Sequence, residues 1–251
     1  MKTASPQSRS HWGATLVATS LLVFSSCVES LAVDISTLLS KFKSERNIAA
    51  KEATLSKVIR TGSGAGQQLF ELASTTEDPD TRWLAIRGLG QLRYKQSAPF
   101  LLRCLSDKNI YVRSNSARAL GELGEHSAVP ALIELFKGEP DGGVIEQTAL
   151  AFEMLKATDA IPALKKRINY PSGQTRGWIL GAISVLGSRA DVPFFAAYLY
   201  DKDASVGGTA ARAIEQFTGQ NFGLPKGEGY GGKPIAANGS EFIRIRHYLY
   251  M

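Results

Sequence analysis

The chain has 251 residues, of which 44% are hydrophobic and 21% are charged. This composition can bury a substantial core and excludes a disordered or fibrous protein. The formal net charge is +6, but residues 61–219 contain 17 basic and 17 acidic side chains, so the body of the chain lacks the concentrated positive field of a nucleic-acid binder.

The first 32 residues have the pattern of an export signal. The segment MKTASPQSRSHW is basic, GATLVATSLLVFSSCV is a short apolar run, and SLAVD offers small residues for cleavage after Ala32. An organelle transit peptide is the alternative, because the first 28 residues are rich in serine and contain no acid. We predict an exported protein that is periplasmic, extracellular or membrane-anchored.

The two cysteines have different expected roles. The segment VFSSC resembles a bacterial lipoprotein box, although Phe24 stands where that pattern has Leu, Val or Ile, so Cys27 is a candidate lipidation site. The membrane is a predicted partner only through a lipid at Cys27. Cys104 lies on the apolar stripe of a predicted helix, where we expect a buried and inert thiol.

Residues 33–65 are predicted to form an N-terminal cap. An amphipathic helix is expected over residues 35–60, followed by a flexible joint at TGSGAG. The segment 41–60 has a net charge of +4, from six basic and two acidic side chains, which is typical of a solvated helix face.

Residues 66–219 contain an internal repeat. Proline recurs at Pro99, Pro130, Pro162 and Pro193, at steps of 31, 32 and 31 residues, and a fixed period of this size indicates a solenoid. Each unit contains two helical patterns. The first has proline in its first turn, where the missing N–H costs nothing, and the second ends near Leu-Gly. Neither helix can bury its apolar stripe alone, so stability is shared along the stack.

One unit carries a family resemblance. The segment DKNIYVRSNSARALGELGEHSAVPALIELF, residues 107–136, resembles the short HEAT-like repeats of the phycobilisome lyase type, and the resemblance extends over residues 66–219. It implies an all-α, right-handed superhelix of the armadillo type with about five two-helix repeats and helical caps. That family includes bilin lyase subunits and chaperones as well as scaffolds and adaptors. Residues 220–251 are predicted to form a Gly-rich loop and a C-terminal cap.

The repeat places charged side chains at its joints. If Leu120 marks the centre of the buried helix face, Arg113 lies only about 20° away, at the helix entrance. When the repeats are aligned, Arg82 occupies the position, or column, that Arg113 has in the next repeat. Asp107 lies in the loop before the helix of Arg113. We therefore predict a structural ladder of Arg82, Asp107 and Arg113 between repeats, built from bonds to carboxylates or loop carbonyls.

On the second helices, the positions opposite the buried face hold apolar residues in the middle repeats. These positions are polar in most other repeats, with Leu84 as an exception. An exposed apolar patch on the concave face is typical of a binding surface, unless the helix phase is wrong or Phe242, Tyr248 and Tyr250 cover the patch. The predicted partner-binding residues are Leu150, Met154, Trp178, Gly181 and Val185.

Catalytic motifs are not evident in the sequence. The three histidines stand apart with no His-Glu pair, no G-x-S-x-G is present, and GEGYGG at 227–232 lies between Pro225 and Pro234 rather than between a strand and a helix. We predict no metal, no cofactor and no catalytic residue, and therefore no enzyme.

The predicted function is that of an exported, non-catalytic scaffold or adaptor, which binds a protein partner through the concave face and does not bind nucleic acid. The alternative, which the family resemblance allows, is a bilin lyase-like chaperone that assists attachment of a prosthetic group.

Overall fold

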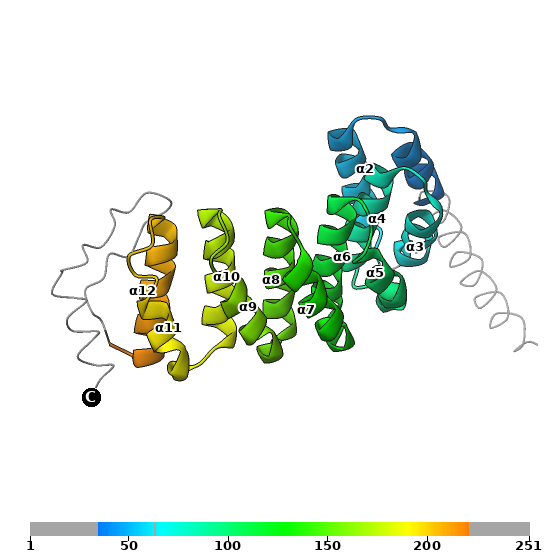
Figure 1. Cartoon of the computed structure of the whole chain (residues 1–251). Helices are drawn as coiled ribbons and strands as arrows, with labels where there is room; N and C mark the ends of the chain where they lie inside the picture. The colour runs from blue at the N-terminus through cyan, green and yellow to red at the C-terminus, as the bar shows by residue number, and fades with distance from the viewer. Residues whose placement is uncertain (1–34, 63, 221–251) are drawn as a thin grey trace, which may run out of the picture.

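The computed structural model describes residues 35–62 and 64–220, and within them every regular element is helical (Figure 1). The helices pair and stack side by side in one row from α2 to α12, which confirms the predicted all-α solenoid of HEAT-like repeats. The first helices of the pairs are residues 35–44, α3 (Ala65–Thr75), α5 (Ala98–Cys104), α7 (Val129–Gly138), α9 (Ile161–Arg167) and α11 (Val192–Ala196). The second helices are α2 (Ile48–Arg60), α4 (Pro79–Gln91), α6 (Ile110–Leu123), α8 (Gly142–Leu155), α10 (Gly173–Leu186) and α12 (Ala204–Thr218).

The start of each second helix is set by a capping side chain. At every one of these starts an Asn, Asp or Ser accepts a hydrogen bond from a backbone N–H of the first turn, which satisfies donors that the helix itself leaves free. The capping residues are Asn47, Asp78, Asn109, Asp141, Ser172 and Asp203.

The later first helices begin in a different way. A single 3₁₀ turn leads directly into each of α5, α7, α9 and α11, and the repeating proline stands in the first turn of the helix. The 3₁₀ turns are η1 (Lys95–Ser97), η2 (His126–Ala128), η3 (Thr158–Ala160) and η4 (Arg189–Asp191).

Small residues bring the second helices together. A Cβ built on Gly90 would meet the backbone of Ala119 at 2.9 Å, and one built on Gly121 would meet the backbone of Ala151 at 2.9 Å. Helices α4, α6 and α8 therefore touch nearly backbone to backbone. We call α4, α6, α8, α10 and α12 the inner row, because each packs against the next and this close packing makes their side of the stack concave.

The N-terminal cap differs from the prediction. The single helix expected over residues 35–60 is broken at residues 45–47, because Asn47 caps a new helix by accepting a bond from the Ala50 N–H at 3.2 Å. Helix 35–44 and α2 thus form a pair like those that follow, with Phe42 and Val58 fully buried. The leader at 1–32 with Cys27, and the predicted cap at 220–251 except for its first residue, lie outside the described residues, so their roles stay predictions.

Candidate functional site on the concave face

The inner row exposes an apolar strip over α8 and α10. Met154, Trp178 and Val185 are 39%, 38% and 60% exposed, and Leu150 and Gly181 are partly exposed. Only three other large apolar side chains of the described chain are exposed, and all lie near the N-terminal ends of α2 and α6. The structure therefore brings the five predicted residues to one surface, which we call the concave strip, while their binding role stays a prediction.

Gly181 leaves this strip open. A Cβ built there would meet nothing within 4 Å, so a side chain at this point of α10 would extend into solvent over the strip. On α6, Arg118 Nε donates to Glu122 Oε1 at 2.8 Å. The strip is therefore bordered on the α6 side by a paired charge. On α12, Arg212 bonds Thr209 Oγ1 at 3.0 Å and forms no ion pair with any residue of 35–62 or 64–220. The strip thus has an apolar floor and one available guanidinium at its rim.

Leu84 corrects the predicted exposure of this position at the start of the stack. It stands in the same column as Trp178 but is fully buried, because α2 packs against α4 and covers this face. The apolar residue in that column is a core residue in α4 and a surface residue in α10.

A second exposed apolar group lies at the N-terminal ends of α4 and α6. The rings of Trp83 and Tyr111 lie 5.8 Å apart, Tyr111 is 55% exposed, and Ile110 is exposed beside it. This group is not evident in the sequence, because Trp83 and Tyr111 occupy different positions of the repeat and the repeat pattern does not pair them.

Cations at the helix entrances join consecutive repeats. Arg82 Nη1 donates to Asp107 Oδ2 at 3.3 Å, and Arg113 donates to the Asp107 carbonyl at 2.9 Å. Arg113 also forms a two-point bond with Glu139, at 2.8 Å from both Nε and Nη2, which the sequence analysis did not foresee. We call this row, extended by Lys51 with Asp78 and by Arg176 with Asp201, the cation ladder.

The ladder is interrupted at α8. Ile145 takes the place of the cation there, and Tyr170 takes the place of the acid, with its hydroxyl donating to the Pro140 carbonyl at 2.5 Å. Arg167 substitutes for the missing ion pair by donating to three carbonyls, two in the last turn of α7 and one in the loop before α8. These acceptors are Phe136 O at 2.9 Å, Lys137 O at 2.8 Å and Glu139 O at 2.9 Å.

The ion pair of Lys51 with Asp78, the first in the cation ladder, makes the fold sensitive to acid. Burial raises the pKa of Asp78, but hydrogen bonds from Lys51, Thr81 and Asp80 outweigh it and hold that pKa at about 2. Since the folded-state pKa of Asp78 lies below the ordinary value, the stabilisation by this ion pair is present above about pH 4 and is lost as the pH falls toward 2. We expect the stability difference between wild type and Asp78→Asn, measured by urea unfolding, to shrink over that interval. An undiminished difference at pH 2 would contradict this role of Asp78.

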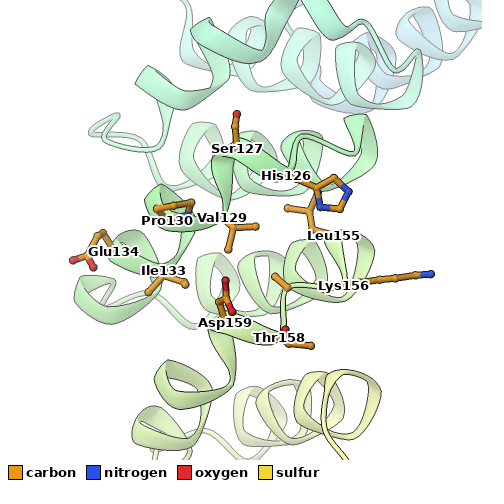
Figure 2. A pocket seen from close by; sticks show the side chains of 11 residues that line it. His126, Ser127, Val129, Pro130, Ile133, Glu134, Leu155, Lys156, Thr158 and Asp159 are labelled. Atoms are coloured by element: carbon orange, nitrogen blue, oxygen red, sulfur yellow. The ribbon is translucent and has the colours of Figure 1, made fainter.

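A shallow pocket of about 580 Å³ lies at the joint between α7 and η3 (Figure 2). Val129, Ile133 and Leu155 give it apolar walls, and Glu134 and Asp159 stand at its rim. It contains no residue of the concave strip, and the described chain has no group of His, Cys, Asp and Glu side chains that could hold a metal ion. This pocket has the character of a groove between repeats.

Cys104 is buried, as expected of a structural thiol. Burial in the core raises its pKa to about 11, with Asp107 adding to the shift, so the thiolate is scarce at neutral pH. Among the described helices none is long and apolar enough to span a bilayer.

Comparison with known proteins identifies the repeats and finds relatives among bilin lyase subunits. The family of HEAT repeats matches residues 66–153. The phycocyanobilin lyase subunit alpha of Nostoc sp. (strain PCC 7120) is 33% identical over 164 residues, which cover 57% of this chain and 59% of that protein. Its namesake from Picosynechococcus sp. is 32% identical over 157 residues, covering 59% and 55%. The chain thus spans less than two thirds of the length of these relatives.

A solved structure has the same fold. The complex of CpcE and CpcF of phycocyanin lyase from Nostoc sp. PCC7120 matches with a TM-score of 0.54 and 20% identity, over 86% of this chain and 93% of the matched chain. This likeness supports the stacked HEAT architecture and, at that identity, nothing further.

These relatives correct two predictions. The chain was expected to be a non-catalytic scaffold and not an enzyme, but the relatives that share its sequence are subunits of phycocyanobilin lyases. Both expectations are therefore wrong. The error has a physical reason: the expectation rested on the absence of local catalytic motifs and on the fold, and a fold alone does not determine function.

Proposed function

We propose that the chain is a subunit of a bilin lyase, which holds a linear tetrapyrrole on the concave strip while the pigment is transferred to an acceptor protein. The observation that carries this proposal is the 33% identity over 164 residues with a phycocyanobilin lyase subunit alpha. The alternative drawn from the HEAT-like motif therefore becomes the main hypothesis.

The concave strip suits such a ligand. A bilin is a long conjugated molecule with an apolar body and propionate groups, and the strip offers Trp178 and Met154 as flat and polarisable contacts. The open surface at Gly181 leaves room for the body of the molecule, and Arg212 at the rim can pair with a carboxylate.

The described residues favour non-covalent binding. Cys104 is buried and its raised pKa keeps it in the thiol form, so it is not a nucleophile that could accept the pigment. In this proposal the chain shields and orients the bilin, and the acceptor protein supplies the group to which it becomes attached. A protein partner is thus part of the function.

Titration of the full chain with phycocyanobilin tests the proposal. We expect saturable binding, seen as a change in the bilin absorption spectrum, with a dissociation constant in the micromolar range or below, about −8 kcal/mol. Co-expression with a bilin source and a phycocyanin acceptor should then increase the yield of pigmented acceptor. A full chain that leaves the phycocyanobilin spectrum unchanged at all concentrations would contradict the proposal.

A further inference from the structure

Glu153 lies on the stripe of α8 that faces α10. Glu146 shows which face of α8 is turned toward α10. It accepts hydrogen bonds from Thr175 Oγ1 at 3.0 Å and from Gln174 Nε2 at 3.2 Å, both on α10. Glu153 follows Glu146 by seven residues, which is two helical turns, so it lies on the same stripe. The same step on α10 leads from Thr175 to Ala182, which places Glu153 opposite a small residue.

The register of the repeats makes this position unusual. In α4 and α6 the equivalent residues are Gly90 and Gly121, which pack tightly against Ala119 and Ala151 of the next helix. In α8 the same place holds Glu153, so a carboxyl group stands where the two preceding joints are closed by backbone contact. The joint between α8 and α10 therefore contains a polar side chain that packing does not require.

The described chain provides no partner for the carboxyl of Glu153. It is partly buried, and it forms no hydrogen bond or ion pair with another residue of the described chain. Burial alone raises its pKa, and no neighbouring charge contributes to the shift.

Charged side chains on the helices that pack against α8 are already engaged. On α6, α7 and α10, which pack against α8, every charged side chain is bonded within the protein, and α8 itself adds Glu146, bound to α10, and the exposed Lys156. The pairs are Arg113 with Glu139, Arg118 with Glu122, Glu134 with Lys137, and Arg176 with Asp201. Glu153 is thus left available to a ligand.

The surroundings of Glu153 belong to the concave strip. Leu150 lies one turn earlier on the same helix, and Met154 is the next residue. On α10, Trp178 and Val185 stand one turn before and one turn after Ala182. The acid therefore lies between the exposed aromatic and aliphatic contacts of the strip.

We propose that Glu153 is a ligand-contacting residue of the concave strip, whose carboxylate accepts hydrogen bonds from the pyrrole N–H groups of the bound bilin. This inference rests on the function proposed above. An N–H donor is the complementary partner for an unpaired carboxylate between apolar walls, and charge-assisted bonds of this kind are stronger than neutral ones. Glu153 then complements Arg212, with one residue holding the nitrogen-rich centre of the pigment and the other a propionate.

The test compares Glu153→Gln with wild type in phycocyanobilin titrations of the full chain between about pH 4 and pH 8, the interval in which a carboxyl with a raised pKa ionises. For wild type we expect affinity to strengthen as the pH rises, because the ionised carboxylate is the better acceptor. For Glu153→Gln we expect at least tenfold weaker binding at neutral pH and loss of this pH-dependent step. Glu134→Gln on α7, which removes a carboxylate outside the strip, serves as the matched control. It should retain the wild-type affinity at neutral pH and the wild-type change of affinity with pH.

Stability measurements separate a binding role from a structural one. A raised folded-state pKa means that ionisation of Glu153 opposes folding, so stability is lost as the pH rises through that pKa. Glu153→Gln should therefore melt at the same or a higher temperature than wild type at neutral pH, while it binds the pigment less well.

Each outcome decides one question. If wild type does not bind phycocyanobilin, the proposed function itself fails. If wild type binds and Glu153→Gln binds with the same affinity and the same pH profile, the proposed function survives and the role of Glu153 is wrong. If Glu153→Gln weakens binding only because it lowers the melting temperature, Glu153 is a structural residue and the inference is also overturned.

Discussion

Replacing Arg113 with alanine is expected to lower the free energy of unfolding by about 3–5 kcal/mol, which is the range for removing one partner of a buried ion pair. The Arg113 side chain is 15% exposed, and the Glu139 side chain that it binds at two points is 2% exposed. Alanine would leave that carboxylate without its cation and would free the Asp107 carbonyl as well. Urea unfolding followed by far-ultraviolet circular dichroism measures the change.

An exposed ion pair between helices provides the control. Arg87 on α4 bonds Glu52 on α2 at 2.7 Å, but both side chains are more than 40% exposed. Arg87→Ala should therefore cost less than about 1 kcal/mol. Equal losses for Arg87→Ala and Arg113→Ala would refute the view that burial gives the cation ladder its strength. Glu139→Gln combined with Arg113→Ala should recover part of the loss, since the second change removes the stranded charge.

A glutamate at position 181 is expected to weaken phycocyanobilin binding at least tenfold, or by about 1.4 kcal/mol. A Cβ at this position meets nothing within 4 Å, so the glutamate has room to extend over the concave strip, where it would occupy the ligand's place and oppose the ligand's carboxylates. The helix itself should not suffer, because glycine in a helix interior is less favourable than most residues by up to about 1 kcal/mol. Equilibrium titration with phycocyanobilin gives the affinity, and thermal melting shows that the fold is intact.

Two variants test whether the effect belongs to this surface. Gly181→Ala should raise stability slightly and leave most of the binding, since a methyl group fills little of the strip. Gly138→Glu adds the same side chain at the end of α7, where it also meets no neighbour but lies outside the inner row. Unchanged affinity in Gly181→Glu, or an equal loss in Gly138→Glu, would place the bilin elsewhere.

The function was harder to predict from the sequence than the fold or the exposed residues. The outward columns of α8 and α10 identified the five residues of the concave strip, and the structure exposes them on one surface. The same residues fit a protein partner or a flat pigment, because an apolar surface carries little chemical identity. Similarity to phycocyanobilin lyase subunits, rather than any local motif, overturned the scaffold hypothesis.

Local signals in the chain specify the helices of residues 66–219 and their order, whereas the break at residues 45–47 was not predicted. Helix periodicity, the repeating proline and the capping residues are local signals, so they specify pairs of helices without knowledge of neighbours. The inward position of Arg113 follows from that same periodicity. The tertiary structure adds the partners of these side chains: Arg113 binds Glu139, Leu84 is covered by α2, and Glu153 stands at a position where the two preceding second helices have glycine. The physical reason is that burial and pairing depend on the adjacent repeat, whose surface is fixed only when the stack assembles.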